Sequence, residues 1–267
     1  MITPMADAHI HLADLIDRDQ GFPERMTAGW SCCAASHDEA EWDRVEVLRP
    51  RLPPFVSSFG IHPQNAVWTD ADFLSRLAAE GRIVAIGEAG FDFFGDRPER
   101  VRDTDNEVAQ RAVFEYQLEL ALRLGLPLLL HLRKAMDLAF AYAPRLRRLP
   151  AAVFHSFSGS PADAQSLVAK GVNAFFSFGA PVLNGNKRAA AACAAVPLDR
   201  LLAETDAPWQ PPRGGDFCRA EDIVPVVAGM ARLRGIDASA GAGTEAFAQS
   251  LVANFHLAYA VPASAPL

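Results

Sequence analysis

The stretch Met5-Ala6-Asp7-Ala8-His9-Ile10-His11 starts with apolar residues and ends in a cluster of polar side chains. If it forms a β-strand, His9 and His11 point to the same face about 6 to 7 Å apart at Cα, because alternate side chains of a strand share a face. Two imidazoles placed in this way can grip one metal ion. A surface strand that carries two histidines by chance is the commoner origin of an isolated His-x-His, so the metal interpretation needs support from the rest of the chain.

Further potential metal ligands stand at the ends of other apolar runs. His131, His155 and Asp206 each close such a run, and Glu88 follows one immediately. Parallel strands end at one mouth of a barrel, so these side chains are expected to lie together. Imidazoles combined with carboxylates suit zinc or manganese, and an oxygen-rich pair of sites also accepts magnesium. The sequence therefore predicts a centre for one or two divalent metal ions.

A carboxylate can bridge two ions, which favours a two-ion arrangement. The group expected around one ion is His9, His11, Glu88 and Asp206, and the group expected around the other is Glu88, His131 and His155. Two ions about 3.5 to 4 Å apart can bind both the attacking and the leaving oxygen of a phosphoryl transfer.

Apolar runs alternate with amphipathic segments along the whole chain. The expected strands are 5–11, 30–35, 55–59, 83–86, 126–130, 151–154, 174–178 and 201–203, and the expected helices are 38–48, 69–79, 107–124, 135–146, 161–170, 187–195, 223–234 and 245–258. This alternation implies parallel strands joined by right-handed crossovers, and about eight such units point to a closed barrel. The predicted fold is α/β, a single (β/α)8 TIM-type barrel domain over residues 1–267. The glycine-rich fingerprint of a Rossmann fold is absent from the sequence.

Local signals set several of the expected boundaries. Thr69 with Asp72 three residues later predicts a capping box, and Pro161 sits where a helix can begin. Residues 12–25 lack a clear period and are expected to form a polar connection, and residues 96–105 a charged loop. The glycines expected to end helices are Gly81, Gly125 and Gly171.

The composition is typical of a soluble globular enzyme, with 50% hydrophobic and 21% charged residues. The formal net charge of −7 argues against binding of polyanions by bulk electrostatics but leaves room for a local basic pocket. The cysteines form no Cys-x-x-Cys pair, which predicts a reducing compartment. No signal peptide or membrane-spanning run is evident, so we expect a cytoplasmic monomer that needs neither a membrane nor an obligate protein partner.

Several motifs resemble those of the TatD-type metal-dependent hydrolases of the amidohydrolase superfamily. The matching segments cover nearly the whole chain and are 7–11, 60–63, 87–92, 110–117, 131–135, 155–159, 197–208 and 254–255. Three residues beside the expected ligands depart from the family pattern: Phe91 replaces leucine, Ser156 replaces cysteine, and Lys134 replaces an acidic residue. These departures bear on the choice of substrate.

The resemblance implies a barrel that holds one to three divalent ions and acts as a hydrolase, in many members a deoxyribonuclease. It also implies that His62 touches the scissile group. The metal ligands implied by position are His9, His11, Glu88, His131, His155 and Asp206.

The leading hypothesis for function is a phosphodiesterase that acts on DNA ends as a 3′–5′ exodeoxyribonuclease. Metal-activated water attacks phosphorus, Asp206 acts as the base, and Glu88 bridges the ions. His62 and Arg133 neutralise charge on the phosphate. The residues expected to support the metal ligands without binding the ion themselves are Asp7, Asp92 and Glu204.

Two other functions stay open at this stage. The same metal site can serve a carboxyl-ester, lactone or amide hydrolase, including an aminoacyl-tRNA deacylase, and the sequence does not separate this class from the nuclease. A non-catalytic metal-binding scaffold is disfavoured, because it has little reason to retain six ligands. Trp209 is either a base-stacking platform or a packing residue of its loop.

Overall fold

The computed structural model of the chain describes residues 4–26, 29–236 and 241–261. The strands are β1 (Met5–Ile10), β2 (Trp30–Ser36), β3 (Val56–Phe59), β4 (Ala85–Asp92), β5 (Leu128–Arg133), β6 (Ala152–Phe154), β7 (Ala174–Phe178) and β8 (Leu201–Ala203). The α-helices are α1 (Leu12–Arg18), α2 (Glu39–Leu48), α3 (Ala71–Ala79), α4 (Thr104–Leu124), α5 (Met136–Leu146), α6 (Pro161–Ala169), α7 (Lys187–Ala195), α8 (Ile223–Leu233) and α9 (Gly241–Ala258). Short 3-10 helices are η1 (Arg49–Arg51), η2 (Pro63–Asn65), η3 (Pro98–Arg100), η4 (Ala180–Val182), η5 (Leu198–Arg200) and η6 (Ala220–Asp222).

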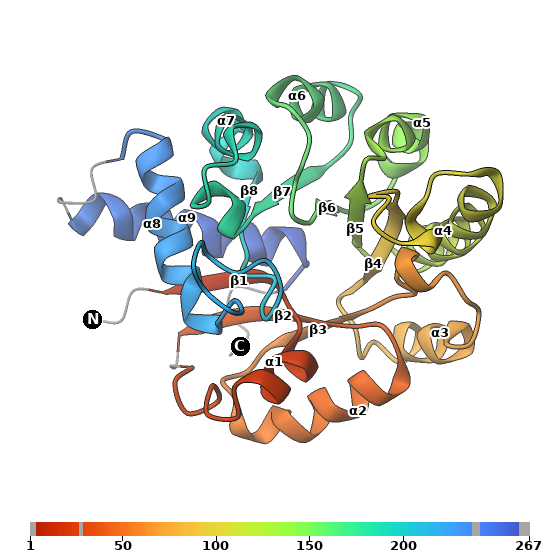
Figure 1. Cartoon of the computed structure of the whole chain (residues 1–267), viewed down its shortest axis with the longest axis horizontal. Coiled ribbons are helices and arrows are strands. Elements are labelled where there is room, and N and C mark those ends of the chain that lie inside the picture. The colour runs from red at the N-terminus through yellow and green to blue at the C-terminus, as the bar shows by residue number, and fades with distance from the viewer. Residues whose placement is uncertain (1–3, 27–28, 237–240, 262–267) are drawn as a thin grey trace.

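The strands form one parallel sheet in the order β1 to β8, and the helices surround it (Figure 1). The segment after β8 returns to β1: the backbone N–H of Asp206 donates to the carbonyl of His9 at 3.0 Å. The N–H of His11 donates to the carbonyl of Ala207 at 2.9 Å. These bonds complete the ring, so the predicted (β/α)8 TIM-type barrel is confirmed.

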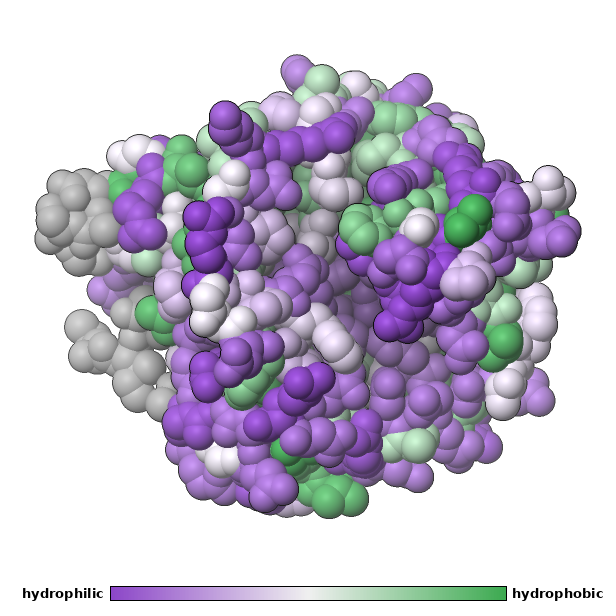
Figure 2. All heavy atoms as spheres, in the orientation of Figure 1, coloured by the Kyte–Doolittle hydropathy of each residue, from purple (hydrophilic) through white to green (hydrophobic). Residues whose placement is uncertain are grey.

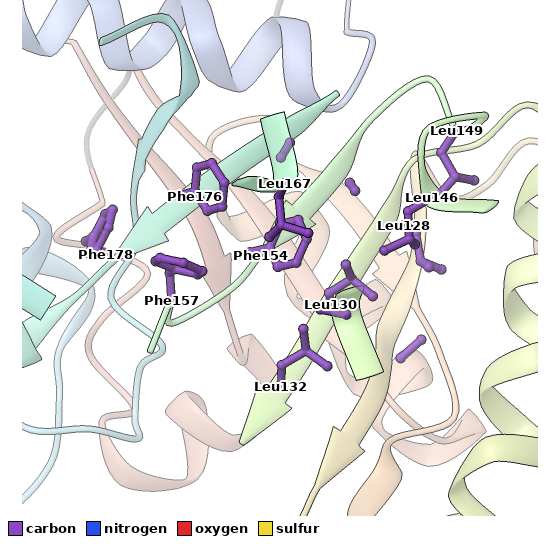
Figure 3. Packing of buried hydrophobic residues seen from close by; sticks show 14 of the residues in the cluster. Leu128, Leu130, Leu132, Leu146, Leu149, Phe154, Phe157, Leu167, Phe176 and Phe178 are labelled. Carbon is purple, nitrogen blue, oxygen red and sulfur yellow. The ribbon is translucent and has the colours of Figure 1, made fainter. Parts of the chain in front are cut away.

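Residues of the central strands alternate between two packing environments. Those that face the helices belong to the largest apolar cluster and include Leu128, Leu130 and Leu132 of β5, Phe154 of β6 and Phe176 of β7 (Figure 3). Leu129 and Val153 belong instead to a cluster that joins residues of most strands inside the barrel. His131 and His155 continue this inward series two residues later, so both side chains enter the barrel. The alternation thus explains how hydrophobic strands deliver polar groups to one site.

Glycines let β4 continue beyond the expected end of this strand at residue 86. Gly87 has a φ of 139° and Gly90 a φ of 149°, values that favour glycine. A Cβ at Gly87 would lie 2.3 Å from the carbonyl oxygen of Leu129, and one at Gly90 would lie 2.1 Å from that of His131. The two glycines therefore allow β4 and β5 to approach closely.

The longer strands change the place of two candidate ligands. Glu88 lies within β4, whereas the sequence predicted it directly after a strand. His131 likewise lies within β5, which runs to Arg133 instead of ending at Leu130. Glu88 nevertheless contacts both His131 and His155, the latter directly after β6.

A short helix replaces the predicted polar connection after β1. Leu12, Ala13 and Leu15 of α1 are buried. Packing of one apolar face can stabilise a helix that is too short to show a clear period in the sequence. The prediction of an irregular connection over this part of the chain was therefore wrong.

Helix ends match the sequence in some places and differ in others. Gly125 in the left-handed conformation ends α4, and Pro161 begins α6, as predicted. The capping box at Thr69 is wrong, because Asp70 precedes α3 and makes no side-chain cap bond. α4 starts at Thr104, earlier than expected, because the carboxylate of Asp103 accepts from a backbone N–H in its first turn. α9 also begins earlier than predicted, at residue 241.

The last helix packs against the barrel near the start of the chain. The Tyr259 hydroxyl donates to the carbonyl of Ala8 at 2.5 Å, and Asn254 Nδ2 donates to the carbonyl of Leu201 at 2.8 Å. α9 therefore holds β1 beside β8. Within the part of the chain that the structure describes, no helix has both the length and the apolar character needed to cross a bilayer.

Candidate metal centre

Six polar side chains from five strands or their ends meet at one mouth of the barrel. His9 lies in β1 and His11 directly after it, Glu88 in β4 and His131 in β5. His155 and Asp206 follow β6 and β8. All six predicted ligands are buried. The structure therefore brings the complete predicted set together.

The carboxylate of Glu88 stands at the centre of this group. Its Oε1 lies 3.0 Å from Nδ1 of His131 and 3.1 Å from Nε2 of His155. Its Oε2 lies 3.4 Å from Nε2 of His9 and 3.6 Å from Nε2 of His11. One oxygen thus faces each of the two groups expected from the sequence, as a bridging carboxylate would.

Asp206 completes the group around the first histidine pair. Its Oδ1 lies 3.2 Å from Nε2 of His11 and 3.4 Å from Nε2 of His9, and these two nitrogens are 3.0 Å apart. Asp206 has a φ of 58°, which is uncommon for a residue other than glycine and is typical of strained positions at functional sites. Gln210 Nε2 donates to its other oxygen at 2.5 Å.

Charge in this buried group is balanced without lysine or arginine. Glu88 is 2% exposed and Asp206 6%, and among the described residues neither forms an ion pair with either cationic side chain. Burial would raise the pKa of Glu88, but the neighbouring His9 and His155 hold it well below its usual range. Burial opposes protonation of His9, yet Glu88 and Asp206 raise its pKa to about 9.

This donor set fits divalent metal ions. Several imidazole nitrogens and carboxylate oxygens point at the same small volume, and in the metal-free protein protons on histidine supply the compensating charge. Groups of three whose ligand atoms lie within 4.8 Å of one another are His9–His11–Asp206, His9–Glu88–His155, His11–His37–Glu88 and His62–Glu88–His131. The first of these matches three of the four residues expected around one ion.

Acidic residues behind the ligands fix the orientation of the histidine rings. Asp92 Oδ2 lies 3.1 Å from Nε2 of His131, and Glu204 Oε2 lies 3.3 Å from Nδ1 of His155. Asp7 has a different task. It accepts hydrogen bonds from the hydroxyl and backbone N–H of Thr205, which ties β1 to the segment that carries Asp206. Burial raises the pKa of Asp7 to about 7 despite these bonds.

His37 belongs to the same cluster, although it is absent from the ligand set predicted from the sequence. Its Nε2 lies 2.9 Å from Oε2 of Glu88, and its Nδ1 lies 3.3 Å from the carboxylate of Glu41. His37 directly follows β2 and continues the inward series of Cys33, which packs inside the barrel. Because His37 lies an even number of residues after Cys33, the sequence could have predicted that its side chain also points into the barrel.

His62 serves both a turn and the site. Its Nδ1 accepts from the backbone N–H of Gln64, so in the neutral ring the proton sits on Nε2. This Nε2 lies 3.3 Å from Nδ1 of His131 and 3.8 Å from Oε1 of Glu88. Burial holds the pKa of His62 well below its usual value. His62 therefore presents a neutral N–H to the cluster.

These residues carry the motifs that the comparisons with known proteins recognise. The family model described as "TatD related DNase" matches residues 6–259. The chain belongs to the TatD related DNase family. A 3′-5′ ssDNA/RNA exonuclease TatD from Erwinia billingiae is 33% identical over 80% of this chain and 85% of its own. A protein of the same name from Cronobacter sakazakii is 37% identical over 74% of both chains.

Solved structures agree with the TatD family assignment. YJJV, a TatD homologue from Escherichia coli K12, has a TM-score of 0.82 and 27% identity, and the match covers 98% of this chain and all of that one. A TatD-family hydrolase from Entamoeba histolytica shares the fold with a TM-score of 0.75 at 18% identity over 97% of this chain and 99% of its own. The predicted family and the class of metal-dependent hydrolase are thereby confirmed.

The TatD site opens into a cavity of about 840 Å³. A hollow near the middle of one face is bordered mostly by hydrophilic residues in Figure 2. Arg133 lines the cavity, and its guanidinium lies 4.0 Å from the centre of the Phe94 ring. The ammonium of Lys134 donates to the carbonyl of Phe94 at 2.7 Å. Lys134 therefore anchors the loop after β4, and it is absent from the cavity lining that the structure describes.

The other two departures from the family pattern have different settings. Phe91 faces the helices, where its ring lies 4.8 Å from that of Phe114, so it is a core residue. Ser156 lines the cavity with a φ of 43°, and Gln210 Nε2 donates to its hydroxyl at 2.9 Å. Because Gln210 also contacts Asp206, Ser156 is connected to the metal centre through one side chain.

Proposed function

We propose that this TatD-family hydrolase is a 3′–5′ exonuclease that trims single-stranded DNA ends with one or two divalent ions. The observation that carries the proposal is the convergence of histidines on the two oxygens of the buried Glu88, with Asp206 beside His9 and His11. The relatives from Erwinia and Cronobacter, which are named 3′-5′ ssDNA/RNA exonucleases, support the substrate class. We propose further that residues 1–267 act as one catalytic domain, as a monomer in the cytoplasm.

The proposed ions are magnesium, manganese or zinc. His9, His11 and Asp206 would hold one ion. His131 and His155, which both contact Oε1 of Glu88, would hold the other, and Glu88 would be shared between them. When bound, such ions polarise a phosphoryl oxygen and make a water molecule more acidic. Asp92 and Glu204 keep the second pair of imidazoles in position, as carboxylates behind histidine ligands commonly do.

Asp206 is the proposed proton acceptor. Burial would raise its pKa, but the hydrogen bond with His11 and the charge of His155 hold it far below the usual value, so the carboxylate is ionised. Gln210 occupies one of its oxygens and leaves Oδ1 directed at the histidine pair. An attacking water placed at this oxygen can lose its proton there.

His62 and Arg133 are the proposed contacts to the scissile phosphate. His62 offers a neutral N–H at the edge of the cluster, and Arg133 carries a fixed positive charge at the end of β5. Both line the cavity. Donors that are already in place where negative charge develops stabilise a transition state without reorganisation.

The cavity supports action on strand ends. The metal centre lies at its buried inner surface, since the candidate ligands are all less than one tenth exposed. A frayed single strand can enter such a recess more easily than the middle of a duplex. The net charge of −7 also limits long-range attraction to DNA, so recognition rests on local contacts.

Metal depletion and reconstitution on linear single-stranded DNA test this function. We expect the chelated protein to be inactive, and magnesium, manganese or zinc to restore release of mononucleotides. Glu88→Gln should abolish turnover while the protein still folds and melts cooperatively, because the side chain serves the site rather than the apolar core. Full activity after chelation would contradict the proposal. Turnover of carboxyl esters without cleavage of DNA would favour the ester hydrolase instead.

A further inference from the structure

The lining of the cavity changes character around the barrel mouth. After β1, β2 and β3 the lining is acidic, with Asp14, Asp38, Glu41 and Asp70. From the end of β6 to the segment after β8, the described cavity lining has no acidic residue other than Asp206 and includes the apolar residues Phe157, Phe178, Val182 and Trp209. Between these two sectors, the loop after β4 and the end of β5 contribute Arg97, Arg100 and Arg133. A phosphate on the strand that leaves the cavity is therefore repelled on one side and attracted on the other.

Arg97 differs from the other two arginines in the interactions of its side chain. Arg97 lies directly before η3, and its side chain is exposed at the cavity. Among residues 4–26, 29–236 and 241–261, no hydrogen bond or ion pair is formed by this side chain. Glu99 of the same loop also lines the cavity. Asp96, another acidic residue of the loop, is already paired with Arg100. A guanidinium without a protein partner beside a nuclease centre is suited to a phosphate.

Arg100 links the loop to the metal centre. Its guanidinium donates to Gln64 Oε1, and Gln64 Nε2 donates to Asp92 Oδ2 at 2.7 Å. Asp92 in turn holds His131, which faces Glu88. The Nε–H of Arg100 is buried and has no acceptor among the described residues, so this side chain retains donor capacity that the protein leaves unused.

The loop is fixed in place independently of Arg97. The backbone N–H of Phe93 donates to the carbonyl of Arg133 at 2.9 Å, and Lys134 Nζ donates to the carbonyl of Phe94. At the far end of the loop, Asn106 Nδ2 of α4 donates to the carbonyls of Pro98 and Val101, each at 2.9 Å. Because the loop is anchored in this way, the charge of Arg97 has a defined position relative to the metal centre.

From this arrangement we infer that the loop between β4 and α4 forms a subsite for a second substrate phosphate, one that is not cut. Arg97 contacts this phosphate, and Arg100 is a positioning residue that connects the subsite to Gln64 and Asp92. The inference rests on the proposed function. In a strand whose 3′ end lies at the metal centre, the retained part leaves over the rim, so the recognised phosphate is the next one on the 5′ side.

Two small substrates test the contact between Arg97 and the second phosphate. TpT has only the scissile phosphate, whereas pTpT carries one more phosphate on the 5′ side. We expect the wild-type enzyme to prefer pTpT in kcat/KM, and Arg97→Ala to lower the pTpT to TpT ratio about tenfold, the size of one charge-assisted hydrogen bond. Arg97→Lys should recover part of the ratio because it keeps the charge.

A matched control separates the contact from loop structure. Arg102→Ala removes a cation from the same loop, but its partners are Asp137 and Glu107, and Arg102 is not part of the described cavity lining. This variant should keep the wild-type preference for pTpT. The salt dependence gives a second readout: Arg97→Ala should reduce the log–log slope for pTpT binding by about 0.7, the value for one phosphate on a single strand.

Binding to the metal-free protein tests the subsite without catalysis. Isothermal titration should show tighter binding of pTpT than of TpT, and Arg97→Ala should remove the difference. This measurement stays decisive if the loaded enzyme cleaves neither substrate, an outcome that would overturn only the proposed function. The subsite is wrong if wild-type protein shows no preference for pTpT in binding or turnover, or if Arg97→Ala and Arg102→Ala change the ratio equally.

Discussion

The carboxylate of Asp92 lies 3.1 Å from Nε2 of His131, on the opposite edge of the ring from Glu88. This contact fixes the ring so that Nδ1 faces the metal centre. The hydrogen bond also holds the pKa of Asp92 well below its usual range, although burial acts in the other direction. A carboxylate that orients a histidine in this way contributes to metal affinity without being a ligand.

Asp92→Asn should therefore weaken metal binding by about 10- to 100-fold. The amide keeps the shape of the side chain but loses the negative charge that polarises His131. Competition with a chelating dye measures the affinity, and Asp43→Asn on the exposed face of α2 is the control. If both variants bind metal like the wild type, Asp92 has no orienting role.

His37→Ala should lower activity about tenfold or more, because it removes the contact at 2.9 Å to Glu88 and a potential ligand. Glu41→Gln should have a smaller effect, since Glu41 only orients the ring. Steady-state kinetics and metal content measure both variants. His256→Ala in α9 is the matched control, because that histidine lies outside the cavity lining that the structure describes. Equal activities for His37→Ala and His256→Ala would show that His37 is a bystander.

Metal uptake should release protons and strengthen as the pH rises. His9 has a pKa raised to about 9 and His37 to about 10, because nearby carboxylates outweigh the burial that disfavours their charge. At pH 7 a metal ion must displace these protons, so the apparent affinity should increase up to about pH 9. Isothermal titration in buffers of different ionisation enthalpy counts the released protons. An affinity that is constant from pH 6 to 9 would contradict this account.

The metal-free protein should show the opposite trend in stability. A histidine whose folded pKa is raised above its unfolded value of 6.5 stabilises the fold fully below that value, and this stability is lost as the pH rises through the folded pKa. Thermal melting of chelated protein should therefore fall between pH 7 and 10. Chelated protein that melts at the same temperature throughout this range would show that the two pKa values are not raised.

Gly90→Ala should destabilise the fold by about 2 to 4 kcal/mol. The new methyl group would lie 2.1 Å from the carbonyl oxygen of His131, and the φ of 149° disfavours any side chain. Gly214→Ala is the control, since its φ is 85° but no atom lies within 4 Å of the added Cβ. Chemical denaturation gives both free energies of unfolding. Equal losses would mean that conformation alone, and not the approach of β4 to β5, requires glycine.

Strong local patterns predicted most of the fold. Strand ends with histidine or aspartate, and the period of the helices between them, were sufficient for a barrel with the predicted ligands at one mouth. The family resemblance added His62, whose position after β3 the structure confirms. The bounds of β4 could not be predicted, because glycines such as Gly87 and Gly90 usually interrupt a strand. In this fold, glycine is required at both positions because β5 approaches closely.

Other features depend on contacts that are distant in the sequence. His37 faces Glu88 across 51 residues, and its inward direction follows from the pairing of β2 with its neighbours. α1 forms because its apolar face is buried, not because of its own period. Arg97 and Arg100 lie in a segment that reads as an ordinary charged loop, and only the fold turns them toward the cavity. The sequence pattern therefore offers only the parity of His37 with Cys33, and it shows neither the burial of α1 nor the direction of the two arginines.

We propose that the enzyme removes nucleotides from the 3′ ends of single strands. Incubation of metal-loaded protein with a linear single strand, the same strand blocked at its 3′ end, and a covalently closed circle of the same sequence tests it most directly. We predict rapid shortening of the free linear strand, slow or no cleavage of the blocked strand, and an intact circle. Rapid cleavage of the circle would contradict the claim.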